Sequence, residues 1–304
     1  MPVDTMDDFI TIVDVGPRDG LQNEPRTLPS EVKVELINRL AECGVPVIEA
    51  GSFVSPGWVP QMADSGKVLE GIKPLPGTRY PVLVPNEKGF ELAARAGATE
   101  IALFTAASES FSRENTNCSI SESISRLQTV AKRAGGSGMR IRAYISCVLG
   151  CPYEGNIETG TVVSISEQLM QMGCDEISLG DTIGAGTAAQ ANALVQSVSQ
   201  VVPMEKLAVH FHDTYGQALA NILACLDAGI TTVDASVAGL GGCPYASGAS
   251  GNVATEDVVY MLHGLGLETG IDLAALAETG NWISKQLGRT SDSKAGTALF
   301  NKQT

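Results

Sequence analysis

The chain has 304 residues, a formal net charge of −14 and a pI near 4.6, and 44% of its residues are hydrophobic. This length and apolar content suit a large core, whereas the acidic balance disfavours a nucleic-acid binder, which needs a basic face. No run of eighteen apolar residues is present, so we expect no membrane span. The acidic N-terminus, MPVDTMDDFI, has neither signal-peptide nor transit-peptide character, and the seven cysteines lack CxxC spacing. These features predict a cytoplasmic protein with reduced thiols rather than a disulfide scaffold or a structural zinc site.

Short β-branched runs alternate along the chain with segments of helical periodicity. Eight such strand–helix units in succession predict an α/β fold, the (β/α)8 TIM barrel, and a doubly wound open sheet is the alternative. We expect one domain over 1–304, with the barrel over about 9–268. The expected strands are 9–15, 46–50, 79–84, 100–106, 140–147, 176–180, 207–212 and 231–237.

The first expected helix, SEVKVELINRLAECG, starts at Ser30 as a candidate N-cap and ends at a glycine. Several expected helices end in this way just before the next strand, which is typical of the αβ loops of a parallel sheet. The glycines are Gly44, Gly97, Gly173 and Gly229. Residues 271–288 predict an extra C-terminal helix.

Polar residues at the ends of the strands are the candidates for function, because barrel enzymes carry their chemistry there. Arg18 and Asp19 follow the first strand, Glu49 ends the second, and Asp181 ends the sixth. Each carboxylate has a structural alternative. Asp19 fits a turn or a cap, Glu49 a buried partner of Arg18, and Asp181 a cap of the following helix.

Two of the three histidines, His210 and His212, are one residue apart in the seventh strand. Alternate residues of a strand face the same side, so both imidazoles can share one metal ion inside the barrel. A core histidine is the alternative reading. Together with Asp19 and Asn252 they form a candidate set of two oxygen and two nitrogen ligands. This set suits Mg²⁺ or Mn²⁺ and also tolerates Zn²⁺, Co²⁺ or Ni²⁺.

The last βα loop, VAGLGGCPYASGASGN (237–252), is rich in glycine but lacks the third glycine of a dinucleotide-binding turn. We interpret it as a long loop that can act as a lid. Cys243 is either an inert thiol or a reactive one above the metal site. Asn252 also fits a turn. Glu256 and Asp257 fall in the first turn of the next helix, where the helix dipole accounts for them.

Six stretches together resemble the 3-hydroxy-3-methylglutaryl-CoA lyase family of metal-dependent barrels, and the resemblance covers about residues 9–290. It departs from the family at Gly51 and Gly57, where we expect threonine and lysine in many members. The stretches are VGPRDGLQNE, SFVSPGWVPQMADS, LGCPYEG, ISLGDTIG, VHFHDTYGQALAN and VAGLGGCPYASGASGNVATEDVVYMLHGLG.

The resemblance implies the role of each candidate residue. Asp19, His210, His212 and Asn252 match the ligands of a divalent metal, and Arg18 matches the residue that neutralises an enolate oxygen. Glu49 and Asp181 match active-site acids, and Cys243 matches the catalytic thiol of the family's mobile loop. From the chemistry of the reaction we expect Asp181 to take part in a proton relay for the hydroxyl and Cys243 to protonate the enolate.

The implied reaction is the retro-Claisen cleavage of 3-hydroxy-3-methylglutaryl-CoA into acetoacetate and acetyl-CoA, a step of leucine degradation and ketone-body formation. The implied partner is an acyl-CoA, with no nucleic acid and no membrane, and we expect a homodimer or homotetramer. Residues that bind CoA are not identifiable. Alternatives are a lyase for citramalyl-CoA or a longer-branched glutaryl-CoA, a Claisen-condensing synthase, and a non-catalytic acyl-CoA-binding protein.

Overall fold

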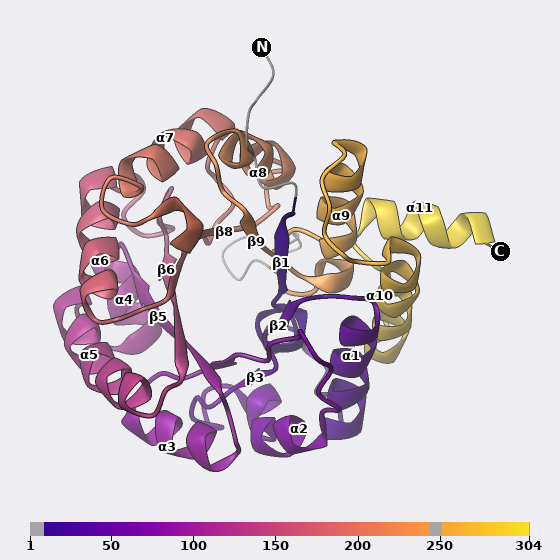
Figure 1. Cartoon of the computed structure of the whole chain (residues 1–304), viewed down its shortest axis with the longest axis horizontal. Coiled ribbons are helices and arrows are strands. Elements are labelled where there is room, and N and C mark those ends of the chain that lie inside the picture. Colours follow the sequence, from indigo (N-terminus) through magenta and orange to yellow (C-terminus); the bar gives the residue numbers. More distant parts are fainter. Residues whose placement is uncertain (1–8, 243–250, 304) are drawn as a thin grey trace.

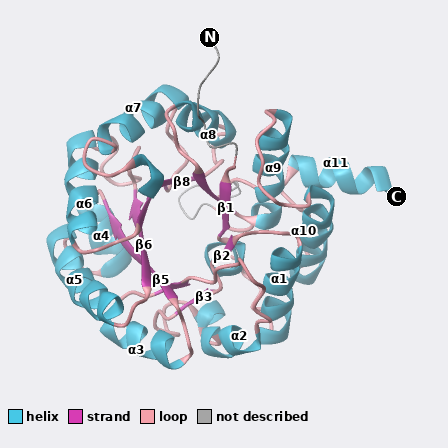
Figure 2. Ribbon diagram, in the orientation of Figure 1, coloured by secondary structure: helices cyan, strands magenta, loops and turns pink. Residues whose placement is uncertain are grey.

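The strands of the computed structural model form one parallel sheet that curls into a ring, with the helices around its outside (Figures 1 and 2). The structure describes residues 9–242 and 251–303, so Cys243 lies outside the described residues. The sheet order is β2-β1-β9-β8-β7-β6-β5-β4-β3. The strands are β1 (Thr11–Asp14), β2 (Val47–Ile48), β3 (Gly51–Ser52), β4 (Val82–Leu83), β5 (Glu100–Ala106), β6 (Arg140–Ser146), β7 (Glu176–Asp181), β8 (Leu207–Phe211) and β9 (Thr232–Ala235).

The expected second strand closes the ring in two pieces. β2 pairs with β1, and β3 pairs with β4 on the other side. The two pieces are separated only by Glu49 and Ala50. The Glu49 N–H donates to the carbonyl of Asp14, and the Ala50 N–H donates to that of Pro81. The eight-strand barrel predicted from the sequence is therefore confirmed, and the open-sheet alternative is wrong.

The described helices are α1 (Ser30–Glu42), α2 (Ser65–Gly71), α3 (Glu87–Arg95), α4 (Glu109–Thr116), α5 (Ile120–Gly136), α6 (Thr159–Gln171), α7 (Ala188–Val198), α8 (Ala218–Asp227), α9 (Thr255–Gly264), α10 (Leu273–Leu287) and α11 (Lys294–Gln303). The predicted glycine ends are present, and Gly44 and Gly229 have φ of +90° and +105°. Ser30 is not the N-cap of α1. The cap position is Pro29, and the Ser30 hydroxyl instead bonds to the carboxylate of Asp64 at 2.8 Å.

The C-terminal extension contains the predicted helix α10 and a second helix, α11, that was not predicted. The two helices lie outside the ring beside α9 and α1 (Figure 1). Asp257 of α9 caps α11 by accepting the Ala295 N–H at 2.7 Å and the Ser293 hydroxyl at 2.8 Å. The start of α11 thus depends on a residue far away in the sequence, which explains why the local pattern did not reveal it.

The helix-dipole account of Glu256 is insufficient, because its side chain is fully buried. Both carboxylate oxygens accept the backbone N–H of Ala238, at 3.0 and 2.9 Å. Burial, the largest cause, raises the pKa of Glu256 to about 8. Glu256 therefore anchors the turn that follows β9.

The faces of the strands separate two environments. Outward residues such as Ile177 and Leu179 of β7 belong to the apolar core under the helices. The inward neighbours Glu176 and Ser178 contact charged side chains inside the ring. This alternation is the two-residue period of a strand, and it brings polar chemistry to the barrel axis. No described helix combines the length and hydrophobicity that a bilayer crossing demands.

Candidate metal centre

Three of the four predicted ligands meet at one end of the barrel. Asp19 lies in a π-helical turn, Gly16–Gly20, that directly follows β1. His210 is on β8 and His212 follows that strand, and their ring centroids are 5.5 Å apart. One ligand atom from each of the three residues lies within 4.8 Å of the others. The strand period therefore produces the pairing of imidazoles that the His-x-His spacing indicated.

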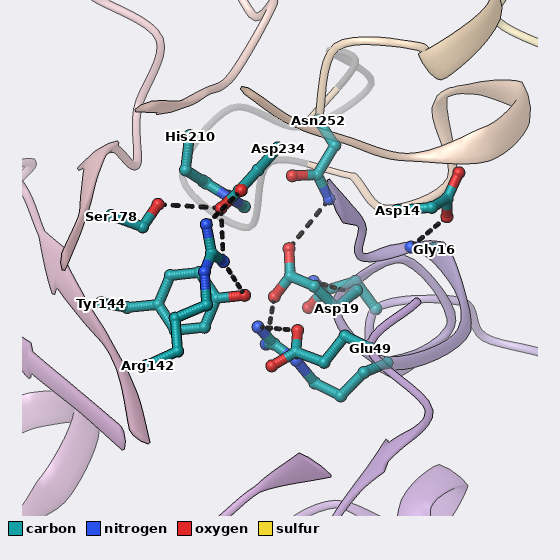
Figure 3. A network of polar contacts seen from close by, with 12 residues as sticks. Asp14, Gly16, Asp19, Glu49, Arg142, Tyr144, Ser178, His210, Asp234 and Asn252 are labelled. Carbon is teal, nitrogen blue, oxygen red and sulfur yellow. Dashed lines mark hydrogen bonds and ion pairs between the residues drawn. The ribbon is translucent and has the colours of Figure 1, made fainter. Parts of the chain in front are cut away.

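Asn252 lies beside this group. It forms a backbone bridge with His212, and its Nδ2 donates to Asp19 Oδ2 at 2.8 Å and to the carbonyl of Leu240 at 3.2 Å. Both amide hydrogens are used in this way, which leaves the amide oxygen as the atom suited to a cation. Figure 3 shows Asn252 directed at Asp19.

The chemistry of these groups fits a divalent cation. The Nδ1 atom of His212 is buried and has no hydrogen-bond partner among the described residues. Burial and the neighbouring His210 lower the pKa of His212 to about 4, so its ring is neutral and can ligate at physiological pH. Burial disfavours ionised Asp19, but Arg18 and the two imidazoles outweigh it and lower its pKa to about 2. Carboxylate oxygens and imidazole nitrogens are donor types that bind divalent metals in proteins.

Arg18 bridges two carboxylates next to this group. Its Nη1 donates to Asp19 Oδ1 at 2.6 Å, and its Nε and Nη2 both lie 2.7 Å from Glu49 Oε2. Glu49 is fully buried, which raises its pKa although the charge of Arg18 opposes that shift. The structural pairing of Glu49 with Arg18 is thus observed, and it holds the guanidinium beside the predicted ligand Asp19.

The Asp181 carboxylate is not part of this group of ligand atoms, although its backbone carbonyl accepts the His212 N–H at 3.3 Å. Asp181 is an outward residue of β7, and its carboxylate accepts the N–H groups of Gly186 at 2.8 Å and Ala185 at 3.3 Å. These contacts fix the turn that leads into α7, which itself starts with a capping box at Thr187. The placement agrees with the structural alternative for Asp181, and its role in catalysis stays a prediction.

A cavity of about 530 Å³ reaches the candidate ligands from outside the barrel. Its lining includes Arg18, Asp19, His210 and His212 together with Trp58 and Phe104. Trp58 is 71% exposed, although tryptophan is usually at least partly covered. The cavity combines an apolar wall with a small set of charged groups, which is typical of a site for an organic ligand.

Sequence reasoning missed a second charged group inside the ring. Arg142 on β6 is 1% exposed and forms ion pairs with Glu176 and Asp234. Tyr144 lines the cavity between Arg142 and Arg18, whose guanidinium carbons lie 4.8 and 5.5 Å from its ring centroid. The sequence did carry a signal, namely the alternation of side chains along a strand. A charged residue at an inward position of a strand is buried and has to find a partner.

Comparison with known proteins adds independent information. The HMGL-like family model matches residues 9–283. The chain is 57% identical over 294 residues to the cytoplasmic 3-hydroxy-3-methylglutaryl-CoA lyase of Mus musculus, covering 97% of this chain and 86% of that one. It is also 57% identical over 289 residues to the mitochondrial hydroxymethylglutaryl-CoA lyase of Gallus gallus, covering 95% and 97%.

Solved structures agree. The crystal structure of hydroxymethylglutaryl-CoA lyase from Pseudomonas aeruginosa matches with a TM-score of 0.95 and 53% identity, covering 97% of this chain and 98% of that one. An Acinetobacter baumannii HMG-CoA lyase in complex with coenzyme A and 3-methylmalate matches with a TM-score of 0.93 and 36% identity, covering 97% of each chain. The resemblance seen in the motifs is thereby confirmed, and the chain belongs to the HMGL-like family.

Proposed function

We propose that this protein is a carbon–carbon lyase that cleaves 3-hydroxy-3-methylglutaryl-CoA into acetoacetate and acetyl-CoA. The observation that carries the proposal is that Asp19, His210, His212 and Arg18 all line a single cavity. The chain is similar over nearly its whole length to lyases named for this substrate.

The proposed metal ligands are Asp19, His210, His212 and Asn252. A divalent cation bound there supplies the positive charge that lowers the pKa of the substrate's tertiary hydroxyl. The two oxygen donors favour Mg²⁺ or Mn²⁺, and the two imidazoles also allow Zn²⁺, Co²⁺ or Ni²⁺.

Arg18 is the proposed electrostatic group for the bond-breaking step. When the bond between C2 and C3 breaks, its electron pair passes into the enolate of acetyl-CoA, and acetoacetate leaves as the ketone. A buried guanidinium stabilises the negative charge that develops on the enolate oxygen. Glu49 holds Arg18 through two of its nitrogens, so the guanidinium is already oriented before substrate binds.

Two proton transfers complete the proposed reaction. The substrate hydroxyl loses a proton, for which Asp181 is the proposed relay, and the enolate carbon gains one, for which Cys243 is the proposed donor. In the structure Asp181 already accepts two backbone N–H groups. Each carboxylate oxygen keeps a further lone pair beside these bonds, so the bonds leave it able to accept a proton.

The remaining proposals concern the domain organisation, the oligomeric state, the location in the cell and the alternative substrate. We infer a single barrel domain over 1–304, with the extension after about residue 268 packed on its outside, and a dimer or tetramer of this chain. A cytoplasmic location remains our proposal, although relatives are named both cytoplasmic and mitochondrial. A related 3-hydroxyacyl-CoA, such as citramalyl-CoA, is the alternative substrate.

The test is release of acetoacetate and acetyl-CoA from 3-hydroxy-3-methylglutaryl-CoA with Mg²⁺, Mn²⁺ or EDTA. We would compare the wild type, Cys243→Ser and the control Cys174→Ser, whose cysteine is buried in the core under the helices. We expect metal-dependent release that collapses only in Cys243→Ser. No release by the wild type with metal bound would reject this substrate, and cleavage of citramalyl-CoA to pyruvate would identify the alternative.

A further inference from the structure

We propose that Asp234 is a positioning residue for His210, held in place by Arg142 and Ser178 so that it fixes the orientation and tautomer of the imidazole. This inference rests on the proposed metal site and concerns how the chain prepares one of its ligands. It gives a function to the charged group inside the barrel that the reaction steps leave unused.

The geometry starts with the contact between the two residues. His210 and Asp234 are register partners on the neighbouring strands β8 and β9. His210 Nδ1 lies 3.3 Å from Asp234 Oδ2, and both side chains are buried. An ionised carboxylate can only accept, so the hydrogen of this bond belongs to Nδ1. The other ring nitrogen, Nε2, then carries the lone pair for a cation.

Asp234 is itself held by donors that favour its ionised form. Arg142 donates from Nη1 to Oδ2 at 3.0 Å and from Nη2 to Oδ1 at 2.5 Å, and the Ser178 hydroxyl donates to Oδ2 at 2.8 Å. Two parallel bonds from a guanidinium to a carboxylate are strong and fix its orientation. The position of the carboxylate is therefore fixed by three hydrogen bonds from two residues (Figure 3).

Arg142 is in turn fixed from its other side. Its Nε pairs with Glu176, and its Nη1 donates to the Tyr144 hydroxyl at 2.7 Å. Glu176 also lies 3.5 Å from Arg140, which is 41% exposed at the edge of the barrel. Glu176 does not contact His210 in any described interaction. Arg142 therefore pairs with two buried carboxylates, Glu176 and Asp234. Only Asp234 contacts a proposed metal ligand, His210.

This arrangement supplies a matched pair of variants, Asp234→Asn and Glu176→Gln. Each variant replaces one carboxylate that pairs with Arg142 by a neutral amide of the same shape. Only Asp234→Asn alters the partner of His210. We expect Asp234→Asn to weaken Mn²⁺ binding by about 10- to 100-fold, the usual effect of changing such an outer partner. Glu176→Gln should leave the Mn²⁺ dissociation constant within about 3-fold. Equal losses in the two variants, or no loss in Asp234→Asn, would overturn the proposal.

A second measurement needs neither metal nor a variant of the acidic residues. The chain has three histidines, so ¹⁵N–¹H spectra of their rings are simple, and His263→Gln and His212→Gln assign them by elimination. In the metal-free wild type we expect His210 as the Nδ1–H tautomer. Detection of the Nε2–H tautomer would overturn the proposal, because an unprotonated Nδ1 cannot donate to Asp234. Failure of the wild type to bind Mn²⁺ would instead sink the proposed function.

Discussion

Gly241 stands where the chain leaves the barrel next to the candidate ligands, and its replacement by alanine tests how tightly the backbone supports them. Gly241 is buried and has a φ of +100°, which L side chains rarely adopt. A Cβ there would lie 3.0 Å from Asn252 Nδ2 and 3.2 Å from the Cα of Gly20. Both distances are shorter than ordinary contacts, so either Asn252 or the backbone has to move.

Two costs follow for Gly241→Ala. Holding alanine at this φ costs about 1–3 kcal/mol of folding free energy. Displacement of the Asn252 amide also disturbs its bond to Asp19, so we expect Mn²⁺ affinity to fall by about 10-fold or more. Urea unfolding measures the first effect, and calorimetric titration with Mn²⁺ measures the second.

The neighbouring glycine provides the control. Among the described residues, 9–242 and 251–303, a Cβ on Gly242 would meet no atom within 4 Å, and Gly242 is exposed. Gly242→Ala should therefore retain both stability and Mn²⁺ affinity. If Gly241→Ala is destabilised but binds Mn²⁺ as well as Gly242→Ala does, the contact with Asn252 does not support a ligand, and our reasoning about this amide is refuted.

Three further predictions concern buried groups. Glu49→Gln removes the negative charge that pairs with Arg18, and we expect kcat for acetoacetate release to fall by about 10-fold or more. The same substitution at an exposed glutamate should leave kcat unchanged. The pKa of Glu256 rises from 4.5 to about 8, so the folded state keeps a proton that the unfolded state loses. The free energy of unfolding of the wild type should therefore fall by up to about 1.4 kcal/mol per pH unit as the pH rises from 4.5 to 8. The urea midpoint of Glu256→Gln should depend less steeply on pH. The dependence that remains in this variant comes from Asp14, whose pKa burial raises to about 7. In Gly280→Ala a Cβ would lie 2.1 Å from Glu256 Oε1, and thermal unfolding should show a loss of about 1–3 kcal/mol; an unchanged midpoint would contradict this packing.

The sequence was informative wherever the signal was local. The strand period placed His210 and His212 on one face, and the two share a site because a strand enforces that geometry over three residues. The repeated strand–helix units led to the correct barrel, even though the second strand is interrupted at Glu49. Local patterns were less reliable at the start of α1, where Pro29 rather than Ser30 occupies the N-cap.

Contacts between distant residues were beyond this reasoning. Arg142 and Asp234 are 92 positions apart, and their pairing depends on how β6 and β9 face each other across the closed ring. The burial of Glu256 likewise depends on the close approach of Gly280 in α10, which no property of α9 reveals. The same limit applies to Asp181. Its place at the end of a strand predicted that it faces the barrel mouth, but the alternation of side chains along β7 directs it outward, toward the backbone of Gly186.

The charges inside the barrel give a reason why its interior suits a divalent cation. The two guanidiniums, Arg18 and Arg142, are surrounded by two carboxylates each, with the ring of Tyr144 between them. Four carboxylates against two guanidiniums leave two negative charges in excess if all are ionised, and burial makes such an excess costly. The rise in the pKa of Glu49 is one expression of this cost. A dication at Asp19 offsets the excess, whereas an anionic substrate that entered first would increase it. The electrostatics therefore favour binding of metal before substrate.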